Sequence, residues 1–178
     1  MHPTVNAGGS AVKHRRGIVV PVAYRAGMAR WQEIEEDAPE FAAKVKARFE
    51  AGTNKTIATL RRDGSPRISG SEAAFRDGEI TFGMMPGSVK LRDVRRDPRI
   101  AMHSPTLEPA SPESWPGDAK LAGIAVEMPP PDGGATEDSG YFRIDIREVT
   151  LTYVGEPADH LVIETWHQDR GHRRLTRK

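Results

Sequence analysis

The sequence contains no cysteine among its 178 residues. Without thiols it can form no disulfide framework, no thiolate nucleophile and no cysteine-ligated zinc or iron–sulfur site. Long hydrophobic runs are also missing. The longest early candidate, 18–23, is interrupted by Pro21 and falls far short of the roughly 18 apolar residues of a membrane span. We therefore expect a cytoplasmic protein with no membrane partner.

Motifs that mark common catalytic and metal sites are absent as well. None of the six histidines stands in an HxxxH or comparable arrangement, so the spacing predicts no metal site. The chain has no GxGxxG, Walker or GxSxG pattern. These absences argue against a Rossmann enzyme and a serine hydrolase.

Charge is nearly balanced over the whole chain but unevenly distributed. The formal net charge is +1, yet residues 1–30 hold five basic residues and no acid, and residues 166–178 hold five basic residues and one acid. Basic ends on an acidic body can mark a nucleic-acid partner. Both stretches lie at the ends of the sequence and lack the interleaved aromatic residues that a base-stacking surface needs. We expect no nucleic-acid binding.

The chain divides into an extension and one domain. Residues 1–27 contain a Gly-Gly-Ser run and two prolines but no hydrophobic period, which predicts a disordered N-terminal extension. A targeting peptide is the alternative because the segment lacks acids, although it is poor in serine and has no clear amphipathic face. Residues 28–178 are long enough for a single domain with its own core.

The hydrophobic pattern of residues 28–178 predicts a mainly β (α+β) fold. Phe41, Val45 and Phe49 recur with helical spacing after Pro39, and Asp37 is a candidate N-cap. Two Asp-Gly pairs separate alternating segments, as in antiparallel hairpins. The expected helices span 39–51 and 89–96, and the expected strands span 56–60, 67–75, 79–84, 99–103, 119–128, 142–154 and 160–166. This count is typical of a small antiparallel β-barrel.

The segment that joins the third expected strand to the second helix has the chemistry of an anion site. Ser88 is a suitable N-cap, and the first turn of a helix offers unpaired N–H groups and a partial positive charge. Lys90, with Arg92 and Arg95 one turn later, adds full charges, so the helix start suits a phosphate. The alternative is that Ser88 only caps the helix and the cations form a solvated face.

The second expected strand carries a polar face. Arg67, Ser69 and Ser71 alternate with Ile68 and Gly70, so the three polar side chains share one side of the strand. This side either faces a ligand or is simply solvated. Glycines inside strands, here at 70 and 83, often mark the close approach of a ligand or another backbone.

Residues 56–69 and 83–101 together resemble the pyridoxamine 5′-phosphate oxidase-like superfamily of flavin-binding split β-barrels. The resemblance rests on a strand, small residues, the Ser88-Val89-Lys90 triplet, a short helix and then Asp-Pro-Arg-Ile at 97–100. It implies an antiparallel split β-barrel of about six to seven strands with two or more short helices, and a homodimer with flavin sites at the interface. It further implies that Ser88, Lys90, Arg67 and Ser69 hold the flavin phosphate and ribityl chain. Trp166 and Arg173 are looser matches that would approach the flavin from the partner chain.

Two departures separate this chain from true pyridoxamine phosphate oxidases. Val89 stands where the superfamily's Ser-Arg-Lys triplet has arginine, and Glu72 aligns with a basic residue that binds the substrate phosphate. The resemblance therefore implies an FMN-binding oxidoreductase that acts on a different small organic substrate. An F420H2-dependent reductase and a non-catalytic flavin- or haem-binding module are the alternatives. No side chain is assigned a catalytic role, because a bound flavin carries the redox chemistry itself.

Overall fold

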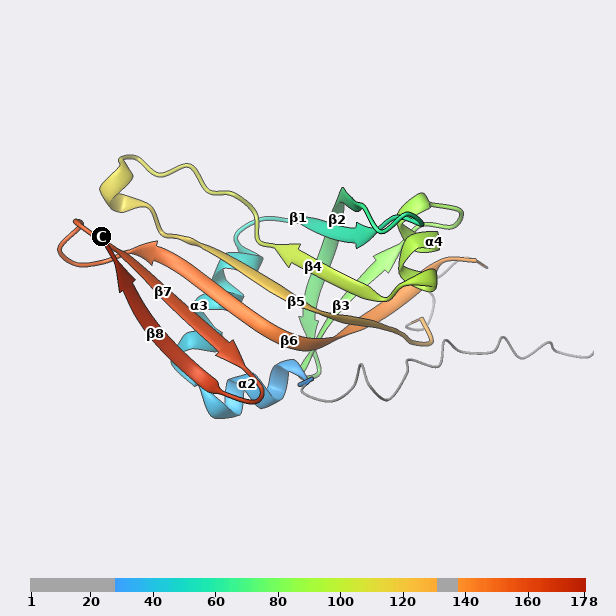
Figure 1. Ribbon diagram of the computed structural model, residues 1–178, viewed down its shortest axis with the longest axis horizontal. Helices are drawn as coiled ribbons and strands as arrows, with labels where there is room; N and C mark the ends of the chain where they lie inside the picture. The colour runs from blue at the N-terminus through green and yellow to red at the C-terminus, as the bar shows by residue number, and fades with distance from the viewer. Residues whose placement is uncertain (1–27, 131–137) are drawn as a thin grey trace, which may run out of the picture.

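One antiparallel sheet of eight strands organises the part of the chain that the computed structural model describes, residues 28–130 and 138–178. The strand order is β3-β2-β1-β4-β5-β6-β7-β8, and a further pairing of β3 with β6 closes the first six strands into a barrel (Figure 1). The strands are β1 (Asn54–Leu60), β2 (Pro66–Arg76), β3 (Glu79–Met84), β4 (Arg99–His103), β5 (Asp118–Glu127), β6 (Gly140–Val154), β7 (Leu161–His167) and β8 (Gly171–Arg177). The predicted fold class is confirmed, while the expectation for residues 1–27 lies outside the described residues.

Both predicted Asp-Gly turns form. Asp77 and Gly78 adopt positive φ angles of 51° and 74° between β2 and β3, as a two-residue hairpin turn requires. In the turn between β1 and β2, Gly64 has a φ of 84° and the N–H of Arg61 donates to the carbonyl of Ser65. The first three strands therefore form the meander that their sequence predicts.

Within residues 28–130 and 138–178 three α-helices accompany the sheet, α2 (Trp31–Asp37), α3 (Pro39–Glu50) and α4 (Val89–Arg96), together with one 3₁₀ turn, η1 (Pro112–Ser114). The predicted apolar stripe of α3 is buried in full. Helix α2 was not predicted, because its seven residues bury only Trp31 and Ile34 and show no complete helical period. The prediction that Asp37 caps α3 is wrong: Ala38 is the N-cap, and Asp37 Oδ2 accepts a hydrogen bond from Trp166 Nε1 at 2.7 Å.

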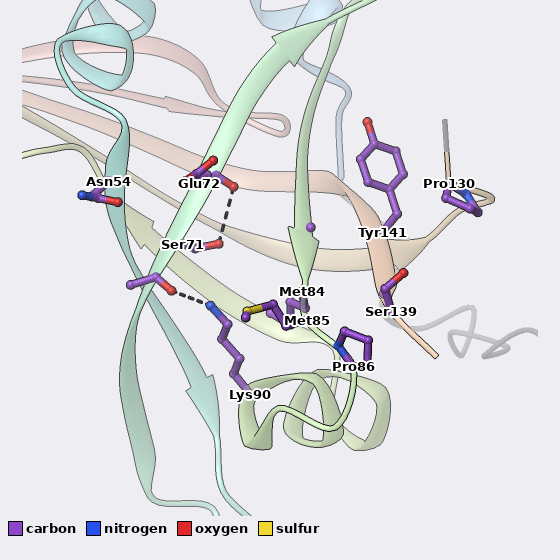
Figure 2. A pocket seen from close by; sticks show the side chains of 13 residues that line it. Asn54, Ser71, Glu72, Met84, Met85, Pro86, Lys90, Pro130, Ser139 and Tyr141 are labelled. Atoms are coloured by element: carbon purple, nitrogen blue, oxygen red, sulfur yellow. Dashed lines mark hydrogen bonds between the residues drawn. The ribbon is translucent and has the colours of Figure 1, made fainter. Parts of the chain in front are cut away.

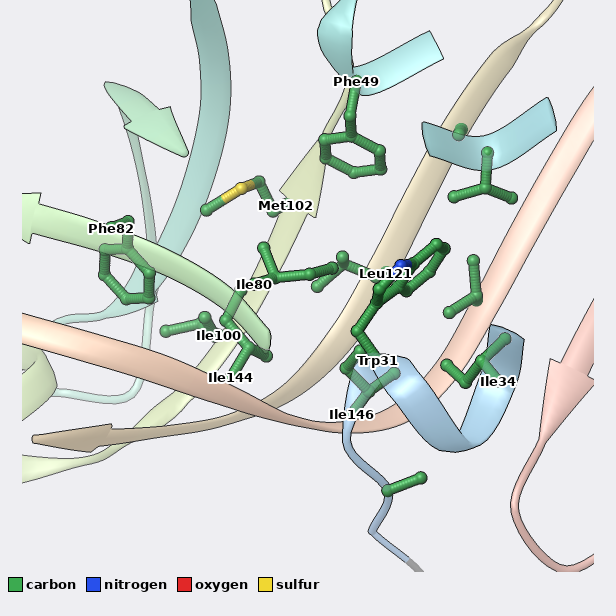
Figure 3. Close-up of a cluster of buried hydrophobic side chains, with 14 of the residues drawn as sticks. Trp31, Ile34, Phe49, Ile80, Phe82, Ile100, Met102, Leu121, Ile144 and Ile146 are labelled. Carbon is green, nitrogen blue, oxygen red and sulfur yellow. The ribbon is translucent and has the colours of Figure 1, made fainter. Parts of the chain in front are cut away.

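The barrel closes on an aromatic pair. Phe82 of β3 lies opposite Phe142 of β6 in the ladder, and the two rings stack with centroids 5.3 Å apart. Together with Ile80, Ile144 and the buried side chains of α2 and α3 they form one hydrophobic cluster (Figure 3). None of the helices in the described residues is long and apolar enough to cross a membrane.

Strands β7 and β8 extend from the long strand β6 as an arm on the side of the molecule away from α4 (Figure 1). A buried carboxylate fastens this arm to α3. Glu164 accepts hydrogen bonds from Lys44 Nζ at 3.1 Å and from Tyr153 OH at 2.7 Å, and its other oxygen lies 2.8 Å from His172 Nε2. Burial alone would raise the pKa of Glu164, but these partners outweigh it and hold the pKa below its usual value.

Candidate functional site

A cavity of about 600 Å³ opens on the outer surface of the barrel, where β2, β3 and β6 meet the start of α4 (Figure 2). Gly70 and Glu72 of β2, Gly83 of β3, Lys90 of α4 and Tyr141 of β6 line it. A Cβ atom added at Gly70 or Gly83 would meet nothing within 4 Å. The two glycines thus leave the backbone of two neighbouring strands open to a ligand.

Helix α4 begins at the edge of this cavity. Gly87 takes a φ of 69°, which reverses the chain after β3, and Ser88 then caps the helix by accepting a hydrogen bond from the N–H of Leu91 at 3.3 Å. Lys90 lies across β2, where its Nζ donates to the carbonyl of Gly70 at 2.5 Å. Lys90 therefore brings a positive charge into the cavity, and Ser88 is confirmed as the N-cap.

Arg67 and Ser69 lie on the opposite face of β2 from Gly70 and Glu72, because side chains alternate along a strand. Both are half-buried, whereas Ile68 is 74% exposed. The alternative that Arg67, Ser69 and Ser71 form a solvated face is therefore wrong, since they face the protein and their neighbours face outward. A direct contact between Arg67 or Ser69 and a cofactor stays a prediction.

Arg67 is held by Asp93, which is not among the predicted site residues. Asp93 is buried in α4 and accepts hydrogen bonds from Arg67 Nε at 2.7 Å, from an Arg96 terminal nitrogen at 3.0 Å and from Thr59 Oγ1 at 3.4 Å. Burial disfavours the charged carboxylate, but the two guanidinium groups outweigh it and keep the pKa of Asp93 below its usual value. This network fixes α4 against β1 and β2. The sequence gives one indication that this acid is buried: Asp93 stands between the apolar residues Leu91 and Val94 in a helix otherwise rich in arginine.

The two remaining predicted residues lie in the arm. Trp166 of β7 is only 3% exposed, and its indole N–H is bound to Asp37, so within its own chain it is a core residue. Arg173 is exposed on β8. The predicted approach of these two residues to a cofactor in a partner chain stays a prediction.

The comparisons with known proteins are confined to solved structures, since no family model and no curated protein match the chain. PhzG from Burkholderia lata is 12% identical, with a TM-score of 0.56 over 89% of this chain and 96% of that one. A pyridoxamine 5′-phosphate oxidase-related, FMN-binding protein from Nostoc punctiforme is 11% identical, with a TM-score of 0.54 over 79% of this chain and 96% of that one. The chain has the split β-barrel fold of pyridoxamine 5′-phosphate oxidase-like proteins.

A third structural neighbour is described as a haem-binding protein. The haem-binding protein from Mycobacterium smegmatis is 18% identical, with a TM-score of 0.50 over 71% of this chain and 58% of that one. At such identities the likeness is one of fold, and function has to be argued from the site. The split β-barrel fold implied by the resemblance of residues 56–69 and 83–101 is confirmed.

Proposed function

We propose that this split barrel binds FMN and is an oxidoreductase that acts on a small organic substrate. The cavity beside Lys90 carries the proposal. Its volume of about 600 Å³ is within the range of small-molecule and cofactor sites. Lys90 and the first turn of α4 supply the positive charge and N–H donors that a phosphate requires, and Gly70 and Gly83 leave an open surface beside them. The residues present fit a phosphorylated cofactor.

Each part of the site would have its own task. A bound flavin supplies the electron or hydride transfer. Lys90 would bind the phosphate, and its hydrogen bond to the Gly70 carbonyl keeps the ammonium group at the cavity before the cofactor arrives. Asp93 would not contact the cofactor but would position Lys90 by fixing α4 against the sheet. The side chains of Met85 and Pro86 line the same end of the cavity (Figure 2) and would exclude water from it.

Comparing FMN with riboflavin tests the proposal directly. The two share the ring and ribityl chain but differ in the phosphate, so a phosphate site at Lys90 should make FMN bind about ten- to a hundredfold more tightly, as for one charge-assisted hydrogen bond. Quenching of flavin fluorescence on titration measures both affinities. The absorbance and mass of any ligand released from the purified protein identify the natural occupant. Equal affinities, or a haem or deazaflavin in the released fraction, would contradict FMN binding at this site.

We further propose that the protein is a homodimer in which a second copy covers the cavity. Three large apolar side chains are exposed at or near the cavity. Met85, which lines it, is 69% exposed, and Ile68 and Val89, close in sequence to the lining residues Gly70 and Lys90, are 74% and 43% exposed. Exposed apolar residues gathered beside a pocket are typical of an interaction surface. A second copy would bury these side chains and close the cavity from outside.

Light scattering at micromolar concentration is expected to give twice the chain mass of 19.6 kDa. Ile68→Arg should shift the protein towards the monomer, because it places a charge in the centre of an apolar interface. Thr106→Arg, on an exposed loop, is the matched control and should remain dimeric. A wild-type protein that stays monomeric would overturn the shared site.

A further inference from the structure

Four residues form a row across the outer face of the barrel. Asn54 of β1 lies opposite Glu72 of β2, and Gly83 of β3 lies opposite Tyr141 of β6. The β2–β3 ladder ends at the pair of Ala73 and Phe82, so Glu72 and Gly83 are the next residues along. The row therefore reads Asn54, Glu72, Gly83, Tyr141 across four adjacent strands.

Gly83 leaves a gap in this row between the side chains of Glu72 and Tyr141, and we call this gap the slot. Gly83 contributes no side chain, and a Cβ atom added there would meet nothing within 4 Å. The strands that carry Glu72 and Tyr141 are two spacings apart, about 9–10 Å, with open space between their side chains. Figure 2 shows the Glu72 carboxylate and the Tyr141 ring on the two sides of β3. A second cavity, of about 500 Å³, shares Glu72, Gly83 and Tyr141 with the first, so the slot lies where the two cavities meet.

The charge of Glu72 is not compensated within the described residues. Its side chain is exposed, and the carboxylate makes no hydrogen bond or ion pair there. Among the described residues that line the first cavity it is the one carboxylate. Neither nearby lysine forms an ion pair with Glu72, since Lys90 donates to the Gly70 carbonyl and Lys55 donates to the carbonyls of Gly52 and Thr53. Arg76 lies four residues farther along β2, about 13 Å away.

We infer that the slot between Glu72 and Tyr141 binds an organic cation such as a protonated amine. The carboxylate on one side supplies the opposite charge, and the face of an aromatic ring attracts cations on the other. The same carboxylate would repel a phosphate or carboxylate group. The cavity is thus bipolar, with an anion end at Lys90 and a cation end at Glu72. Identifying this cation with the substrate rests on the proposed function.

Three probes of similar size test the slot: benzylamine, which is protonated at neutral pH, neutral benzyl alcohol, and benzoate. Calorimetric titration of the purified protein, with FMN added, should show benzylammonium binding at least about tenfold more tightly than benzoate, as expected for one carboxylate and one ring contact. Glu72→Gln should remove most of this preference, and Glu72→Lys should reverse it. Tyr141→Leu should lower the affinity for benzylammonium about three- to thirtyfold and leave the affinity for benzoate unchanged.

Glu108→Lys is the matched control, because it makes the same charge change at an exposed residue that lines neither cavity; it should keep the wild-type preference. Thermal melts establish that each variant is folded. Benzoate binding as tightly as benzylammonium, or an unchanged preference in folded Glu72→Lys protein, would overturn the inference. A protein that takes up no flavin but still prefers benzylammonium would support the slot while refuting FMN as the cofactor.

Discussion

Asp93→Ala is expected to lower the free energy of unfolding by about 3–5 kcal/mol, as when one partner of a buried ion pair is removed. The substitution leaves the Arg67 guanidinium half-buried without its counter-ion, and it removes the acceptor shared by Arg96 and Thr59. Urea denaturation measures the loss. Because Asp93 joins α4 to β1 and β2, the same variant should also weaken FMN binding at the α4 end of the cavity.

Asp97→Ala is the matched control for this result. Asp97 pairs with Arg99 through an oxygen–nitrogen distance of 2.6 Å, but both side chains are partly exposed, and such surface pairs are worth at most about 1 kcal/mol. Equal losses for the two variants would show that Asp93 is an ordinary surface acid.

The contribution of Asp93 should depend on pH in a defined direction. Its pKa is lower in the folded protein than the usual value of an aspartate, so the unfolded chain takes up a proton first as the pH falls. The stabilisation is complete above about pH 4, the ordinary aspartate pKa, and is lost as the pH falls through the lower folded value. The difference between wild type and Asp93→Ala should accordingly shrink below pH 4.

Lys90→Glu is expected to reduce FMN affinity by more than about a hundredfold, beyond the ten- to hundredfold loss of a single charge-assisted bond. The substitution removes the ammonium group that lies at the cavity and puts a repelling charge next to the phosphate. Riboflavin, which has no phosphate, should bind the variant about as well as it binds the wild type. Titration of both flavins therefore separates a lost phosphate site from a distorted cavity.

Lys120→Glu, an exposed residue on β5, makes the same charge change away from the cavity and should leave both affinities unchanged. Full FMN occupancy in Lys90→Glu protein would place the phosphate elsewhere and leave Ser88 as a helix cap alone.

Local signals were enough to predict much of this fold. The apolar stripe of α3, the Asp-Gly turns and the clean alternation at the start of β6 each depend on neighbours within a few residues. The sequence does not predict strand β8, because its residues are exposed from His172 onward and its one large apolar residue, Leu175, stands between Arg174 and Thr176. Its place depends on pairing with β7, which composition does not reveal.

The candidate site was harder to predict, because it depends on register between distant strands. Lys90 and Glu72 stand in recognisable sequence contexts, whereas Tyr141 reaches the cavity only through the pairing of β3 with β6. The face of β2 was equally ambiguous: alternation showed that Arg67 and Ser69 share a side, but only the packing of α4 decides that this side is the inner one. Helix packing and strand register are tertiary effects that a single sequence does not encode locally.

The ladder that closes the barrel is short, with four residue pairs from Thr81 with Arg143 to Met84 with Gly140, whereas β5 and β6 pair over ten. Four of the residues that line the cavity, Gly83, Met84, Gly140 and Tyr141, belong to this ladder. A molecule held in the cavity would therefore touch both strands of this short ladder. Separation of β3 from β6 would disrupt the cavity and open the barrel in a single event. A bound ligand should therefore slow amide hydrogen exchange first in the β3–β6 ladder.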